Sequence, residues 1–276
     1  MSLVYKILNL LFFAGTLAAN YVTIDGIGPF KSIGNISREF NTSLTPPNWT
    51  FSIWALIYIG LLVFSIVQFI PSCGLSTAVD RIGPLFILSC IFNIAWLCAF
   101  GLGTKLSITI SCIIIVALLS TLYAIQSRGN IFQTPSSVGK LLFFDTPFSL
   151  YLGWVLFATF ANIGTLCRAW NILEDEKLLY YIVLSVAAGL YVLNLYINKN
   201  FVTTLVFFYV CIALIAKYKN SVGNNDLLTF TYASVAIMAI FVVVKIATLS
   251  IRRKKKIMQE RLLYNPENSI GFKADV

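Results

Sequence analysis

The chain has 276 residues, of which 58% are hydrophobic and 11% are charged, and its formal net charge is +9. A soluble domain carries about 25% charged residues, so this composition excludes a soluble globular fold and indicates an integral membrane protein. The chain contains no histidine, which is the commonest metal ligand and a frequent general base. We therefore expect no metal, no cofactor and no enzymatic activity.

Eight apolar stretches follow one another along the chain. Each is near the length of about 20 residues that a helix needs to cross the hydrocarbon core of a bilayer. Because backbone groups in lipid must be hydrogen-bonded within the segment, the stretches are predicted to be helices. The expected fold is all-α, a polytopic transmembrane bundle of about eight spans. These spans are Leu3–Val22, Phe51–Ile70, Ile82–Gly101, Leu106–Ile125, Pro147–Cys167, Leu178–Ile197, Phe201–Ala216 and Leu227–Leu249.

The first stretch has a second interpretation. Lys6, the apolar run after it and Ala18-Ala19 are also compatible with a cleaved signal peptide. The run continues through Val22, which favours a span. Cleavage would leave seven spans with the orientation of the others unchanged.

The loop of residues 23–50 carries three glycosylation acceptor sequences, at Asn35, Asn41 and Asn48. Their clustering predicts that this loop is luminal or extracellular and that the protein is in the secretory pathway, in the plasma membrane or an endomembrane. Eight spans would then place both termini in the cytoplasm.

The last span is followed directly by the basic run Arg252–Lys256. Such a run suggests nucleic-acid binding, but its position beside a span favours contact with anionic lipid on the cytoplasmic side. We therefore expect the lipid bilayer, and no nucleic acid, as its partner.

Aromatic and amide residues recur at helical spacing in the second and third spans. Trp54 and Tyr58 are four residues apart, so they share a helix face. In the third span Asn93 precedes Trp96 by three residues. An asparagine at this depth needs partners, so it is expected to face the inside of the bundle.

The fifth span places Trp154, Ala158 and Asn162 on one helical face. Asp145 lies two residues before Pro147 at the start of this span. Because Asp followed shortly by Pro is typical of a helix start, Asp145 is predicted to be an N-cap.

These segments together resemble the TspO family, also called tryptophan-rich sensory proteins or peripheral benzodiazepine receptors. The second helix of that family begins with two prolines followed by Trp, Phe, Trp and Tyr, and its third carries Asn-x-x-Trp. Its fifth carries Trp, Phe, Thr and Asn. The matching residues here are Pro46, Pro47, Trp49, Phe51, Trp54, Tyr58, Asn93, Trp96, Trp154, Phe157, Thr159 and Asn162.

Two features depart from the family pattern. Trp49 and Trp54 are five residues apart, one fewer than usual, and the run Leu166-Cys167-Arg168 lacks the tyrosine of the cholesterol-contact pattern. The resemblance covers residues 1–168, the five-helix unit with its loop 23–50. Residues 169–249 would add three helices, and residues 250–276 a basic cytoplasmic tail.

The resemblance implies a pocket inside the five-helix bundle for a flat or amphipathic apolar molecule, such as a tetrapyrrole or a sterol, and a role as sensor or carrier. Indole and phenol rings offer rigid apolar faces with one polar group. The candidate ligand-binding residues are Trp54, Tyr58, Asn93, Trp96, Trp154 and Asn162. These residues are equally compatible with a purely structural role between helices.

A second hypothesis is a non-catalytic accessory subunit of a larger membrane complex. The three added spans and the glycosylated loop would then dock onto a partner membrane protein. A homodimer is also compatible with the sequence.

Overall fold

The computed structural model describes residues 3–133, 137–172, 175–221 and 223–263, and within them it contains helices and no strand. The all-α prediction is therefore confirmed. The chain divides into two compact parts, Met1–Val235 and Ala236–Val276. Of the tail expected over residues 250–276, residues 264–276 lie outside the described residues.

Among the residues that the structure describes, seven helical segments are long and apolar enough to cross a membrane. A bent pair, α4 (Ser76–Ile82) with α5 (Leu85–Gly101), makes an eighth candidate span with an angle of 61° between its helices. The other spans contain α1 (Leu3–Ile24), α3 (Ile53–Val67), α6 (Lys105–Arg128), α8 (Thr146–Trp170), α9 (Glu176–Asn198), α10 (Phe201–Tyr218) and α11 (Asn225–Leu263).

The third span begins later than expected, because the chain breaks between α4 and α5. Gly83 there has φ +52°, which glycine adopts readily. Pro84 follows and has no N–H to continue the ladder of the preceding helix. The break therefore moves the start of the straight helix from Ile82 to Leu85.

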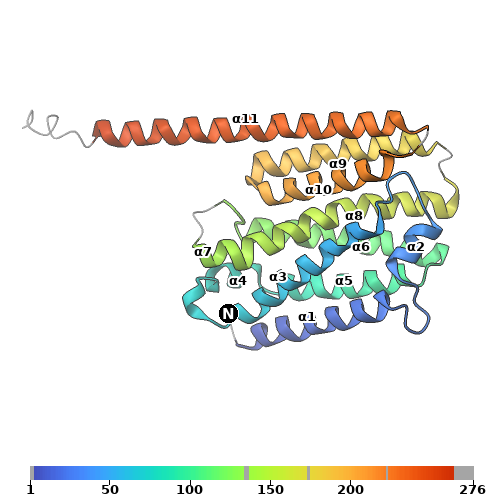
Figure 1. The fold of residues 1–276 in the computed structure, drawn as a ribbon. Coiled ribbons are helices and arrows are strands. Elements are labelled where there is room, and N and C mark those ends of the chain that lie inside the picture. The colour runs from blue at the N-terminus through green and yellow to red at the C-terminus, as the bar shows by residue number, and fades with distance from the viewer. Residues whose placement is uncertain (1–2, 134–136, 173–174, 222, 264–276) are drawn as a thin grey trace, which may run out of the picture. The chain divides into compact units, whose positions relative to one another are not determined.

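The long helices of the first part of the chain lie side by side (Figure 1), and the contacts among five of them close a ring. Around the ring, α1 contacts α5, α5 contacts α6, α6 contacts α8, α8 contacts α3, and α3 returns to α1. Helices α9 and α10 contact each other and pack on α8 from outside the ring.

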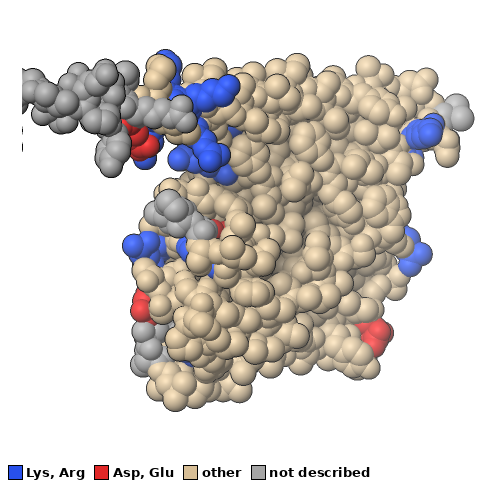
Figure 2. All heavy atoms as spheres, turned by 60° about the vertical axis from the view of Figure 1, so that its left-hand side comes forward, with Lys and Arg blue, Asp and Glu red and all other residues tan. Residues whose placement is uncertain are grey.

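The outer faces of the ring helices are apolar. Leu56 and Ile59 of α3 are 55% and 61% exposed, and Ile113 of α6 is 69% exposed. On the face that Figure 2 shows, charged side chains lie toward the margins and a broad area between them carries none. Exposed apolar side chains on this scale fit a surface that is solvated by lipid rather than by water.

Asp145 does not cap a helix, contrary to the prediction. The chain is already helical before it, in α7 (Val138–Lys140) and in a π-helical turn, η3 (Leu141–Asp145), that continues into α8. Pro147 removes one backbone donor and crowds the preceding turn, and a wide turn accommodates this. The carboxylate of Asp145 is fully buried and lies 2.5 Å from Lys140 Nζ.

A cluster of buried polar side chains joins α9 and α10 to the ring. Gln126 of α6 donates to Asn194 of α9 at 2.6 Å, and Asn194 donates to Thr203 of α10 at 2.9 Å. Asn200, between α9 and α10, donates to Gln126 at 2.7 Å and to Ser149 of α8 at 2.9 Å. These hydrogen bonds join α9 and the turn before α10 to α6 and α8, so the cluster fixes the position of α9 and α10 on the ring.

Helix α10 also approaches α8 closely at Gly153. A Cβ at this position would lie 2.9 Å from Cγ2 of Val206 and 3.2 Å from Cα of Thr203. The absence of a side chain at Gly153 is therefore what allows these two helices to touch.

A candidate ligand site within the helix bundle

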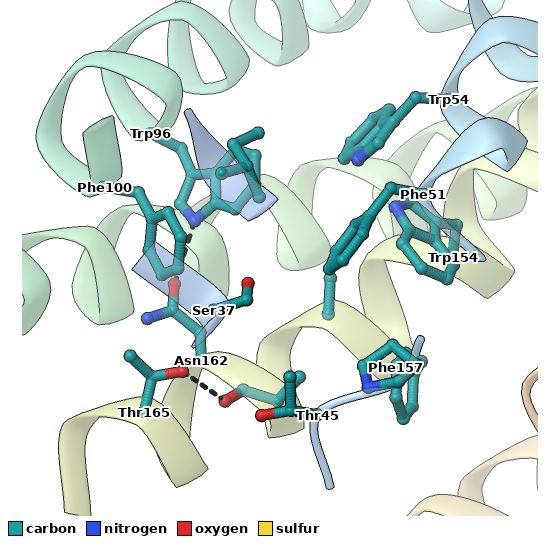
Figure 3. Close-up of a pocket in the computed structure, with 14 residues that line it drawn as sticks. Ser37, Thr45, Phe51, Trp54, Trp96, Phe100, Trp154, Phe157, Asn162 and Thr165 are labelled. Carbon is teal, nitrogen blue, oxygen red and sulfur yellow. Dashed lines mark hydrogen bonds between the residues drawn. The ribbon is translucent and has the colours of Figure 1, made fainter. Parts of the chain in front are cut away.

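A small cavity lies inside the ring, beneath the connection between α1 and α3 (Figure 3). The space open to the centre of a water molecule is about 40 Å³. Its walls come from α2 (Ile33–Glu39), a 3₁₀ turn, η1 (Asn48–Ser52), and α3, α5 and α8. The lining residues are Ile33, Ser37, Thr45, Pro46, Phe51, Trp54, Trp96, Phe100, Trp154, Phe157, Ala158, Ala161, Asn162 and Thr165.

Four of the six predicted ligand-binding residues line this cavity: Trp54, Trp96, Trp154 and Asn162. The Trp54 ring lies 6.0 Å from that of Trp96 and 6.2 Å from that of Trp154, centroid to centroid. In Figure 3, Trp54 and Trp154 are on one side of the space and Trp96 and Asn162 on the other. The three predicted helix faces therefore converge.

Tyr58 and Asn93 do not line the cavity. Tyr58 donates to Asn93 at 3.2 Å, and Asn93 donates to the Tyr151 hydroxyl at 2.8 Å, in a buried network between α3, α5 and α8. Tyr58 also stacks on Trp54, with centroids 5.2 Å apart. These two residues support the cavity wall from behind.

Both polar atoms of the Asn162 side-chain amide are hydrogen-bonded within the protein. Its oxygen accepts from Trp96 Nε1 at 2.9 Å, and its nitrogen donates to Ser111 at 3.1 Å and to the Cys112 sulfur at 3.3 Å. Asn162 therefore joins α5, α6 and α8, which is the structural role of an interhelical amide.

Trp154 differs from these residues. It is 1% exposed, and its Nε1 has no hydrogen-bond partner among the described residues. Leaving a buried donor unsatisfied costs about 1–3 kcal/mol, and buried Trp N–H groups usually find a partner. A residue that lines the cavity thus carries a buried donor for which the described part of the chain supplies no acceptor.

Several lining residues were not predicted. Phe100 follows Trp96 by four residues and stacks on it at 5.5 Å, so helical spacing could have identified it. Ile33, Ser37 and Thr45 come from the loop, where hydropathy carries no periodic signal. We call residues 40–47, between α2 and η1, the lid.

A model of the family described as TSPO-like protein matches residues 6–248. The chain belongs to this family. The match reaches well past residue 168, so it includes α9 and α10 as well as the five-helix ring. No curated protein and no solved structure shows a significant match to this chain.

This TSPO-like protein has a second, larger cleft beside the cavity, with a volume of about 330 Å³. Its walls come from α1, α2, η1 and α3. It shares three lining residues with the cavity, namely Ile33, Phe51 and Trp54. These three side chains separate the inner cavity from the outer cleft.

Two of the three predicted glycosylation residues lie at this cleft. Asn35 on α2, Asn41 in the lid and Asn48 in η1 are all exposed, and Asn35 and Asn48 line the cleft itself. The side-chain oxygen of Asn35 accepts a hydrogen bond from Arg38.

Proposed function

We propose that this protein binds an apolar, planar or amphipathic small molecule, of tetrapyrrole or sterol type, inside the five-helix ring, and that it acts as a sensor or carrier rather than as an enzyme. Membership of the TSPO-like family supports a membrane protein that binds ligands. The observation that carries the proposal is the buried indole N–H of Trp154, a residue of the cavity wall, which finds no acceptor within the described residues.

The residue chemistry suits such a ligand. Rings of Trp54, Trp96 and Phe100 offer flat apolar surfaces, and Trp154 Nε1 offers one donor for a carbonyl, carboxylate or ring nitrogen of the ligand. Ligand sites are usually apolar with a few placed polar groups.

The size of the cavity requires a movement on binding. Small-molecule sites typically have volumes of about 300–1,000 Å³, and the inner cavity is far smaller. A rotation of Phe51 would join it to the outer cleft of about 330 Å³. The ligand body would then lie across the present position of Phe51.

Trp154→Phe tests the role of the indole N–H. The ring face is retained and the donor is lost, so the dissociation constant for a free-base porphyrin should rise about 3- to 10-fold. Binding is followed through the porphyrin absorption band in detergent, because the substitution itself alters protein fluorescence.

Trp170→Phe is the matched control, since Trp170 ends the same helix and is 50% exposed. It should leave the dissociation constant unchanged. Native protein that binds neither a porphyrin nor a sterol saturably would contradict the proposed function.

The proposed membrane and orientation have a separate test. With residues 23–50 facing the lumen, both termini cytoplasmic and the protein in the secretory pathway, endoglycosidase should increase gel mobility. Exchange of Asn35, Asn41 and Asn48 together for Gln should abolish the shift. A native protein whose mobility is insensitive to the enzyme would overturn this topology.

A further inference from the structure

The lid is bound by side chains and backbone of α9 and α10, helices outside the ring that encloses the cavity. Lys217 of α10 donates to the carbonyl oxygens of Thr42 at 2.7 Å and Thr45 at 2.9 Å, with a longer contact of 3.4 Å to that of Ser43. The hydroxyl of the next residue, Tyr218, donates to the Ser43 carbonyl oxygen.

A further contact ties the lid to α9. The Ser43 hydroxyl donates to the carbonyl oxygen of Glu176, the first residue of α9, at 2.8 Å. Three consecutive residues of the lid, Thr42, Ser43 and Leu44, are buried. The lid is therefore an ordered part of the packed structure, held by the ends of two added helices.

The chemistry of Lys217 suits this position. Its ammonium has three N–H donors and its contacts here are three main-chain oxygens of one short segment. Hydrogen bonds from a charged donor are about twice as strong as neutral ones. Since the acceptors are backbone atoms, these hydrogen bonds depend on the backbone path of the lid and not on its side chains.

The same segment closes the ligand cavity. Thr45 and Pro46 line it, and Leu44 is fully buried against α8, where a Cβ at Gly164 would lie 3.4 Å from Leu44 Cδ1. Movement of the lid away from α8 would remove one wall of the cavity. Lys217 holds the lid at both Thr42 and Thr45, so it opposes this movement.

We propose that Lys217 is the latch of the ligand site: from α10 it holds the lid closed over the ring and so sets the rates at which ligand enters and leaves. This role rests on the proposed function, because it concerns the same cavity. Lys217 is a positioning residue and does not itself line that cavity. The added helices thereby regulate access to a site that belongs to the five-helix ring.

The proposal has a kinetic signature. A latch that holds the lid closed in both the empty and the occupied protein slows entry and release together. Its removal should raise both rate constants and change their ratio little. Loss of a direct ligand contact would instead raise the release rate alone.

Lys217→Met removes the donors and keeps most of the apolar stem. Two measurements on the full-length protein in detergent are informative: hydrogen exchange of the lid amides, and porphyrin association and dissociation by stopped flow. Lid amides should exchange about tenfold faster or more, and both rate constants should rise by a similar factor, with the dissociation constant within about threefold of native.

Two control variants define the effect. Lys219→Met, two residues further along the chain and exposed, should behave as native. Lys217→Arg keeps a charged donor and should restore most of the lid protection. Exchange of the α8 amides should stay at the native level in Lys217→Met, which shows that the bundle is folded.

Each result decides one of the two proposals. Native lid exchange in Lys217→Met overturns the latch, whether or not a porphyrin binds. A rise in the release rate without a rise in the association rate also overturns it. If the native protein takes up neither a porphyrin nor a sterol, the proposed function fails, and unchanged or accelerated lid exchange still decides whether Lys217 holds the lid.

Discussion

Lys140→Met is expected to lower the free energy of unfolding by about 3–5 kcal/mol. The Lys140 ammonium lies 2.5 Å from a carboxylate oxygen of Asp145, and the two side chains are 12% and 0% exposed. Removing one partner of a buried ion pair leaves the other charge less well compensated in a site away from water, which costs much more than the pair itself contributes. Reversible denaturation in mixed micelles measures the change.

The exposed pair Lys31–Glu39 provides the control. Its nitrogen and oxygen are 2.7 Å apart, but the side chains are 48% and 46% exposed, so Lys31→Met should cost less than about 1 kcal/mol. Adding Asp145→Asn to Lys140→Met should recover part of the loss. Equal effects of Lys31→Met and Lys140→Met would show that burial is irrelevant to this ion pair.

Gly153→Leu is expected to lower the free energy of unfolding by about 3 kcal/mol, because α8 and α10 could no longer approach each other. The new Cβ alone would lie 2.9 Å from Val206 and 3.2 Å from the main chain of Thr203. Val206 is β-branched and stiff in a helix, and the main-chain atom cannot move without the helix. Denaturation in mixed micelles is again the measurement.

Gly189→Leu is the control for Gly153→Leu, because it changes helix propensity without creating a steric clash between helices. Gly189 is in α9, where a Cβ would meet no atom within 4 Å. The same substitution should there be neutral or stabilising by up to about 1 kcal/mol, since leucine favours the helix over glycine. Similar losses at both glycines would mean that the contact between α8 and α10 does not determine stability.

The spans could be predicted from the sequence because hydrocarbon imposes a length and a composition on any helix that crosses it. The start of α8 differs from the prediction. Asp145 and Pro147 have the pattern of a helix start, yet the buried contact with Lys140 and the π-helical turn continue the helix across them. Tertiary contacts outweighed the local preference.

Within the site, helical spacing grouped residues of the same helix, such as Trp154 with Ala158 and Asn162, because residues on one helix face share their neighbours. The family resemblance brought the rings of Trp54, Trp96 and Trp154 from three helices together, and all three line the cavity. Spacing did not distinguish residues that line the cavity from residues that pack behind its lining. Tyr58 and Asn93 are also on inward faces, but they are hydrogen-bonded to each other and do not line the cavity. The lid could not be placed, since a non-spanning loop takes its path from the helices that hold it.

The polar cluster of Gln126, Ser149, Asn194 and Asn200 has a consequence for how much of the chain can be removed. A truncation after α8 would remove the acceptor of the Gln126 side-chain nitrogen and the Asn200 donor that Gln126 and Ser149 share, and the hairpin alone would lose the partners of Asn200 on α6 and α8. Buried polar groups need hydrogen-bond partners. Neither fragment is thus self-sufficient, and the minimal stable unit extends through α10.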